Sequence, residues 1–119
     1  MKSEVKQMWT AALRSGEYKQ AKDRLKSKEG YCCLGVLCEV AVKEGVIGPA
    51  QSDEHEEDEY FYPDGEDRAG GVLPNAVAEW AGLESPNPIV DGGTLVRRND
   101  SERDGWDFNR LADLIEREL

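Results

Sequence analysis

Three cysteines and a single histidine are the residues of this sequence whose chemistry is most easily named. Cys32, Cys33 and Cys38 fall within seven residues, and His55 is the one histidine of the chain. Together they match the number of ligands that a structural zinc ion takes. Adjacent cysteines point apart on a helix, however, and His55 lies inside an acidic run. The favoured interpretation is no metal site and no cofactor, with the cysteines as small buried hydrophobic residues in a reducing compartment.

No catalytic residue is predicted either. A cysteine nucleophile needs a neighbour that stabilises its thiolate, and the only histidine is distant in sequence. Hydrolysis by carboxylates needs two positioned groups with separated pKa values, and acidic residues are too numerous here to single out a pair. The acidic run also lacks the spaced ligands of a calcium loop.

Cations, amides and tyrosines in three separate segments indicate a different chemistry, the binding of a phosphate-bearing ligand. Such a ligand needs Arg or Lys donors, helix N-terminal amides and an aromatic ring on which its base can stack. The predicted contact residues are Tyr18, Gln20, Arg24, Tyr31, Arg97 and Asn99. They form one site only if the fold brings their segments together. The ordinary alternative is that the cations are solvated and Tyr31 belongs to the core.

The acidic run at 53–59 and the aromatic residues after it support a second hypothesis. Acidic side chains can occupy a basic surface of a partner protein, and tyrosine is enriched in interfaces. The predicted partner-binding residues are Asp53, Glu54, Glu56, Glu57, Tyr60 and Tyr62. The simpler interpretation of this run is a solvated loop that aids solubility.

The elements that must position these residues begin with a helix. Apolar residues at helical spacing predict a helix over residues 4–14, with Ser3 as its cap and Ser15-Gly16 as its end. Residues 17–30 fit either a short helix or an extended edge strand, ended by Gly30.

Residues 31–44 are apolar on nearly all sides, which is typical of a central buried helix. A strand is the alternative, and the length of the segment favours the helix. Gly35 lowers helix propensity, so we expect it to permit close packing against another backbone.

The second half of the chain predicts a long loop followed by three elements. Residues 48–71 are interpreted as a loop, which is unusually long for a small domain. A short helix capped by Gly82 follows, and then a hairpin over residues 88–96 that turns at Asp91-Gly92-Gly93. The last helix begins at Asp104 or Asp107 and carries an apolar face. We therefore predict an α+β fold in one domain, residues 1–119, with three to four helices and a small antiparallel sheet.

Composition limits the partners that the protein can have. The 119 residues carry a formal net charge of -10. The first 30 residues are nevertheless basic, with eight Lys or Arg against four Asp or Glu. This distribution argues against general nucleic-acid binding and leaves room for a local anion site built from the N-terminal third. No signal peptide or membrane-spanning segment is recognised, so we expect a cytoplasmic protein. The sequence leaves its oligomeric state open, self-association included.

Several blocks together resemble a group of small uncharacterised proteins of tailed phages and prophages. The blocks are Trp9-x-x-Ala12-Leu13-x-Ser15-Gly16-x-Tyr18-x-Gln20, GYCCLGVLCE at 30–39, Leu73-Pro74 with Trp80, Asn99-Asp100, and Phe108-x-x-Leu111-Ala112-Asp113-Leu114-Ile115-Glu116. They span nearly the whole chain, and the acidic run is not among them.

The resemblance implies a phage accessory protein that acts in the cytoplasm of a bacterial host. Small proteins of this kind often block host defences, in some cases by sequestering a nucleotide signal without chemistry. The leading hypothesis is thus a non-enzymatic protein that binds a small anionic ligand, such as a cyclic or ADP-ribose-type nucleotide. The alternatives are an acidic protein that blocks a host protein through residues 52–67, and a small nucleotide hydrolase.

Overall fold

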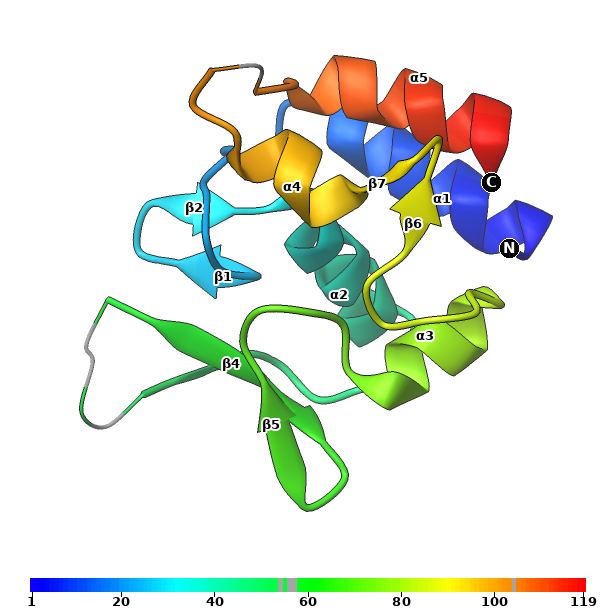
Figure 1. Ribbon diagram of the computed structural model, residues 1–119. Helices are drawn as coiled ribbons and strands as arrows, with labels where there is room; N and C mark the ends of the chain where they lie inside the picture. The colour runs from blue at the N-terminus through cyan, green and yellow to red at the C-terminus, as the bar shows by residue number, and fades with distance from the viewer. Residues whose placement is uncertain (54, 56–57, 104) are drawn as a thin grey trace.

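The computed structural model describes residues 1–53, 55, 58–103 and 105–119 (Figure 1). Within these residues the chain forms five helices and three small antiparallel sheets, which confirms the predicted α+β class. The helices are α1 (Ser3–Arg14), α2 (Cys33–Lys43), α3 (Asn75–Ala81), α4 (Leu95–Asp100) and α5 (Phe108–Glu118). The strands are β1 (Lys26–Ser27), β2 (Gly30–Tyr31), β3 (Gln51–Ser52), β4 (Tyr60–Asp64), β5 (Asp67–Ala69), β6 (Ile89–Val90) and β7 (Gly93–Thr94).

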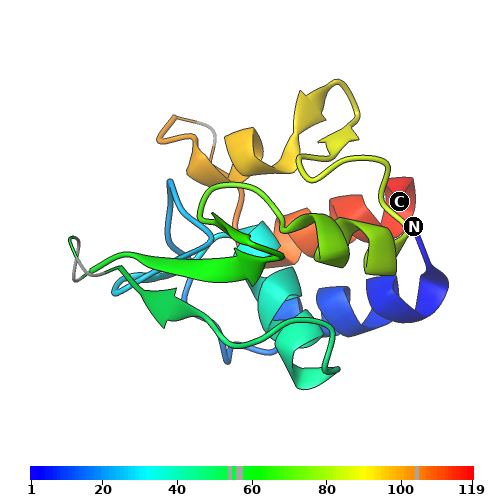
Figure 2. The ribbon, with the colours of Figure 1, turned by 90° about the horizontal axis from the view of Figure 1, so that it is seen from below.

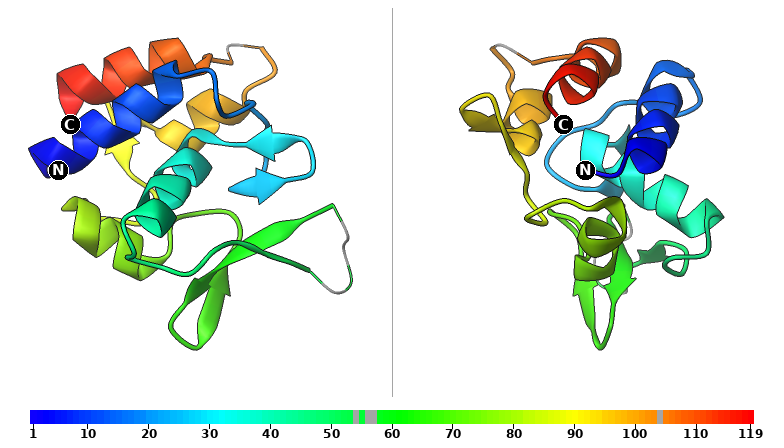
Figure 3. Two further views of the ribbon diagram at one scale, coloured as in Figure 1. Left: turned by 180° about the vertical axis from the view of Figure 1, so that it is seen from behind. Right: turned by 90° about the vertical axis from the view of Figure 1, so that its right-hand side faces the viewer.

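Helix α2 occupies the centre of the molecule, as its all-round apolar sequence predicts. Helices α1 and α5 lie side by side above it, and the β3–β4–β5 sheet lies at the opposite end of the molecule (Figures 1 and 3). Figure 2 shows α3 beside the N-terminal part of α1, near the two ends of the chain. The core residues of α2 are Cys33, Leu34, Gly35, Val36, Leu37, Cys38, Val40 and Ala41. Full burial of one large apolar side chain contributes about 1.5–3 kcal/mol, so this helix supplies much of the folding energy.

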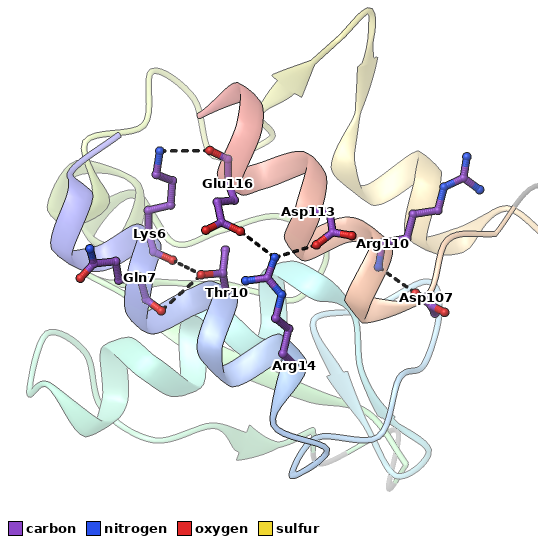
Figure 4. Close-up of polar contacts among 8 residues, drawn as sticks. All are labelled: Lys6, Gln7, Thr10, Arg14, Asp107, Arg110, Asp113 and Glu116. Carbon is purple, nitrogen blue, oxygen red and sulfur yellow. Dashed lines mark hydrogen bonds and ion pairs between the residues drawn. The ribbon is translucent and has the colours of Figure 1, made fainter.

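Polar contacts join α1 to both α2 and α5. Trp9 packs in the core, and its indole N–H donates to the carbonyl oxygen of Cys33 at 2.9 Å. At the surface, Arg14 donates to both Asp113 and Glu116 at 2.7 Å (Figure 4). Because these carboxylates are exposed, the ion pairs contribute little energy, and the buried apolar faces hold the two helices together.

Gly35 has the role that the sequence predicts. A Cβ at this position would collide with the carbonyl oxygen of Leu25, so the chain around residue 25 runs directly against α2. Gly82 also ends α3 in the left-handed conformation, with φ of 72°. The expected cap of the first helix is corrected, since Ser3 already lies inside α1 and Lys2 occupies the capping position without a side-chain hydrogen bond.

Residues 17–30 form neither of the two elements expected. They hold bends, a bridge from Gln20 to Tyr31, and the short β1–β2 hairpin. Gly30 does not end the segment but begins β2, with φ of 142°. A Cβ there would collide with the carbonyl oxygen of Lys19, so only glycine lets the two backbones approach.

The predicted loop at 48–71 contains a three-stranded sheet. Strand β4 pairs with β3 on one side and with β5 on the other, in register Tyr62↔Ala69. The hairpin turns at Gly65, whose φ is 63°. Tyr62 anchors the sheet to the core, where it is fully buried. The interpretation as a loop was therefore wrong for residues 51–52, 60–64 and 67–69.

The hairpin at 88–96 is confirmed, although its strands are shorter than expected. Asp91 and Gly92 both have positive φ, 50° and 82°, which is the conformation of a two-residue type I′ turn. Residues from Leu95 onward form α4, a helix that we did not predict. Asp107 caps α5 by accepting from the N–H of Arg110 at 2.8 Å, whereas Asp104, the other expected start, lies outside the described residues. Among the described helices, none is long and apolar enough to cross a bilayer.

Candidate anion-binding site

Trp106 is the centre of the candidate site. Its backbone N–H donates to the carbonyl oxygen of Arg98 at 3.0 Å, and its own carbonyl accepts from the side-chain amide of Gln20 at 2.8 Å. The guanidinium carbons of Arg98 and Arg110 lie 5.4 Å and 3.7 Å from the centre of its ring. Trp106 is therefore held through its backbone N–H and carbonyl groups, and its indole ring is in contact with two cations.

Arg98 is fixed in place by the turn between β6 and β7. Its two terminal nitrogens donate to the carbonyl oxygens of Gly93 and Asp91, both at 2.8 Å. These acceptors are neutral, so the hydrogen bonds orient the guanidinium without cancelling its charge. A Cβ at Gly93 would lie 3.3 Å from one of these nitrogens, so a larger residue there would press on the guanidinium.

The cap of α4 sets the position of Arg97. The hydroxyl of Thr94 accepts from the backbone N–H of Arg97 at 3.1 Å and so starts the helix at the end of β7. The side chain of Arg97 is then exposed on the first turn of α4. Within the described part of the chain, no carboxylate lies within ion-pair distance of Arg97, Arg98 or Arg110.

These residues surround a surface hollow of about 240 Å³, called here the first hollow. Its lining consists of Gly92, Gly93, Thr94, Arg97, Arg98, Ser101 and Trp106. Two arginines, two hydroxyl residues and a tryptophan thus line one concave surface. Such a set suits an anion attached to a planar group, because arginine binds phosphate through paired N–H donors and indole offers a stacking face.

A second hollow of about 310 Å³ adjoins the first. It is lined by Gln20, Lys22, Asn99, Ser101, Glu102, Arg103, Gly105, Trp106 and Asp107. Ser101 and Trp106 belong to both hollows.

Asn99, a predicted contact residue, is buried and fully used inside the protein. Its side-chain oxygen accepts from Gln20 at 2.8 Å and from the backbone N–H of Cys33 at 3.2 Å. Its amide nitrogen donates to the carbonyl oxygen of Ala21 at 2.9 Å and to Asp100 at 2.8 Å. Asn99 and Gln20 therefore position Trp106 and the segment around residue 20, and their amides are engaged with protein groups.

The other predicted contact residues lie on a different part of the surface. Tyr18 and Tyr31 meet edge to face, with ring centres 5.3 Å apart. Arg24 donates to the carbonyl oxygen of Tyr60 at 3.1 Å and lies 3.4 Å from the carboxylate of Glu59. The six predicted residues thus divide into Gln20, Arg97 and Asn99 around the two hollows and Tyr18, Arg24 and Tyr31 away from them.

The cysteines have the environment of core residues. Burial raises the pKa of the Cys32 thiol to about 11 and raises the pKa of Cys33 and Cys38 well above their ordinary value. All three thiols are therefore neutral near pH 7. Among the described residues, no three His, Cys, Asp or Glu side chains are grouped closely enough to hold a metal ion.

The residues of the alternative, partner-binding hypothesis have mixed positions. Tyr62 is fully buried, and its hydroxyl donates to Glu39 at 2.7 Å, so it offers no surface to a partner. Tyr60 is half-buried beneath the ammonium of Lys26, which lies 4.8 Å from its ring centre. Asp53 lies 3.6 Å from Arg68. Glu54, Glu56 and Glu57 lie outside the described residues.

Sequence reasoning placed Arg98 in the segment after the hairpin without selecting it as a contact residue, and it missed Trp106 and Arg110. A signal was present in the sequence, because the Arg97-Arg98 pair follows the glycine turn after three residues and Trp106 directly precedes the helix cap Asp107. These residues come together because of the unpredicted helix α4. From this helix the side chain of Arg98 reaches back to the carbonyl oxygen of Gly93, and the carbonyl oxygen of Arg98 accepts from the backbone N–H of Trp106.

Fold and site together define a small α+β protein with an arginine-lined surface hollow. The chain belongs to the family described as Domain of unknown function (DUF8296), whose family model matches residues 1–119. No curated protein and no solved structure matches the chain.

Proposed function

We propose that the protein binds a small anionic ligand of the nucleotide type in the first hollow and holds it without chemical change. The observation that carries this proposal is the pair Arg97 and Arg98 beside Trp106, with no carboxylate partner within the described residues. Arg98 is already oriented by neutral carbonyls, so binding an anion requires little ordering of this side chain.

The remaining charge of the protein favours a small ligand over a polymer. A net charge of -10 repels a long nucleic acid, whereas a ligand with a few charges feels mainly the local arginines. The absence of a grouped metal-ligand set within the described residues and the neutral thiols favour binding over catalysis.

The biological role that we propose rests on the sequence resemblance to phage proteins. In an infected bacterium, a protein of this kind would lower the concentration of a nucleotide signal of host defence by sequestering it. The resemblance to phage proteins supports this role. Its GYCCLGVLCE block lies next to the site, because Cys33 donates its backbone N–H to the side chain of Asn99.

The first experiment is native mass spectrometry of the protein with a panel of cyclic and ADP-ribose-type nucleotides. We expect an adduct whose ligand is released with unchanged mass after denaturation, and Arg97→Ala should weaken its binding more than about tenfold. Arg117→Ala is the matched control, because this exposed arginine lies at the far end of α5. An adduct that Arg97→Ala leaves unaffected would place the ligand elsewhere.

Two further results would reject sequestration. A ligand released with an altered mass would identify the protein as an enzyme. The absence of any adduct would direct attention to the alternative, an interaction with a host protein through the acidic run.

A further inference from the structure

The two hollows share a wall. Both are lined by Ser101 and Trp106, and they hold about 240 and 310 Å³. Figure 1 shows α4 between the β6–β7 hairpin, whose turn lines the first hollow, and the β1–β2 hairpin. Because Trp106 is held through both of its backbone groups, the backbone of this shared lining residue has a fixed position.

Each hollow has its own cations. Arg97 and Arg98 line the first hollow, and Lys22 and Arg103 line the second. Within the residues that the structure describes, neither Lys22 nor Arg103 has a carboxylate at ion-pair distance.

Two carboxylates, those of Glu102 and Asp107, also face the second hollow. One oxygen of Asp107 is engaged by the N–H of Arg110, which caps α5. The second hollow therefore attracts an anion only near Lys22 and Arg103, and it repels an anion near Glu102.

From this arrangement we infer that the ligand carries two separated anionic groups, one in each hollow, joined by a part that passes over Trp106. The inference rests on the proposed function, because it assigns a ligand class to the same site. Because Trp106 lines both hollows, a ligand that reaches both sets of cations has to pass over it, so we expect anionic groups spaced more widely than the adjacent phosphates of a diphosphate chain. Phosphates attached to different oxygens of one ribose, or the two phosphates of a dinucleotide, are spaced by sugar atoms and fit the arrangement.

Three adenine nucleotides test the inference by calorimetry. They are AMP with one phosphate, ADP with two adjacent phosphates, and adenosine 3′,5′-bisphosphate with two separated phosphates. The bisphosphate should bind about tenfold more tightly than AMP or ADP, as one additional charge-assisted contact provides. Arg103→Gln should reduce its affinity to that of AMP and leave the affinity for AMP unchanged. Arg97→Gln should weaken all three.

Other results separate the inference from the proposed function. Equal affinities for AMP and the bisphosphate, both lost in Arg97→Gln, would overturn the inference and keep the function. ADP binding as tightly as the bisphosphate would overturn the need for separation. Failure of all three nucleotides to bind would count against both. Arg103 is exposed, so its variant should fold, and circular dichroism with thermal unfolding checks this.

Discussion

The side-chain amide of Gln20 donates to the side-chain oxygen of Asn99 at 2.8 Å, although 79 positions separate the two residues in the sequence. The same nitrogen of Gln20 donates to the carbonyl oxygen of Trp106 at 2.8 Å. This pair joins the N-terminal third of the chain to the wall of the candidate site. The basic N-terminal segment therefore contributes to the site through a neutral amide as well as through Lys22.

Replacement of Asn99 should be strongly destabilising. Asn99→Ala removes the partners of Gln20, Ala21 and the backbone N–H of Cys33, which lie in or near the core. Each buried group left without a partner costs about 1–3 kcal/mol, so we expect a loss of about 3 kcal/mol in the free energy of unfolding. Urea unfolding measures it. Asn109→Ala, at an exposed position of α5, is the control and should change stability by less than about 0.5 kcal/mol.

Gly35 should be the glycine least tolerant of a side chain. Gly35→Ala brings a methyl group into the carbonyl of Leu25, which cannot move without displacing the segment packed on α2. We expect a loss of more than about 3 kcal/mol or a failure to fold. The comparison is Gly71→Ala, where a Cβ meets no atom within 4 Å. A stable Gly35→Ala variant would show that this backbone contact is not needed.

Stability should fall in alkaline solution because the thiols are buried. The pKa of Cys32 rises from 9.0 in the unfolded chain to about 11 in the folded protein. Below pH 9 the thiol is neutral in both states. As the pH rises from 9 to 11, the unfolded chain ionises and the folded protein does not, which favours unfolding.

The decline from Cys32 alone is on the order of 2–3 kcal/mol by pH 11, and Cys33, Cys38 and Tyr62 act in the same direction. Urea unfolding at a series of pH values measures it. Cys32→Ala should reduce the slope, and constant stability through this range would mean that the folded thiols ionise normally.

The role of the acidic run at 53–59 is better tested by neutralising its charges than by deleting it. Removal of residues 52–67 takes away β4 and the buried Tyr62, so the shortened chain should lose most of its cooperative unfolding transition. Replacement of the acidic residues at 53–59 by Asn or Gln keeps the strands. This neutralised variant should unfold within about 1 kcal/mol of the wild type and should bind nucleotide unchanged. Loss of nucleotide binding in it would link the run to the site.

The helices were predictable because their apolar spacing is regular. The apolar face of α5 includes Leu111 and Ile115, and α2 is apolar on nearly every side. Both segments can therefore be predicted as helices from their own sequence, without knowledge of the elements that pack against them. Helix α4 was missed because it has only six residues and begins directly at the end of β7. Its cap, Thr94, lies in a run that also suits a strand, and the burial of Leu95 and Asn99 that accompanies the helix is a tertiary feature that the local sequence does not reveal.

The sheet at 51–69 and the composition of the site depend on contacts distant in sequence. Strand β4 is stabilised by burial of Tyr62 against Glu39 on α2, which no local pattern reveals. Three of the six predicted site residues lie around the hollows. Gln20 and Asn99 are among them because polar residues at junctions between elements can be recognised in the sequence. The partners of Trp106 come from α4, α5 and residue 20, so the site could not be assembled from any one segment.

The pairing of α1 with α5 also governs the order in which the chain can fold during synthesis. The apolar face of α1 leaves the ribosome first, and its partner leaves only when residues 108–118 have been made. Until then α1 has no cover on that side. A chain that stops at Asp107 should therefore bind a dye specific for exposed apolar surface, and extension to Glu118 should abolish that binding.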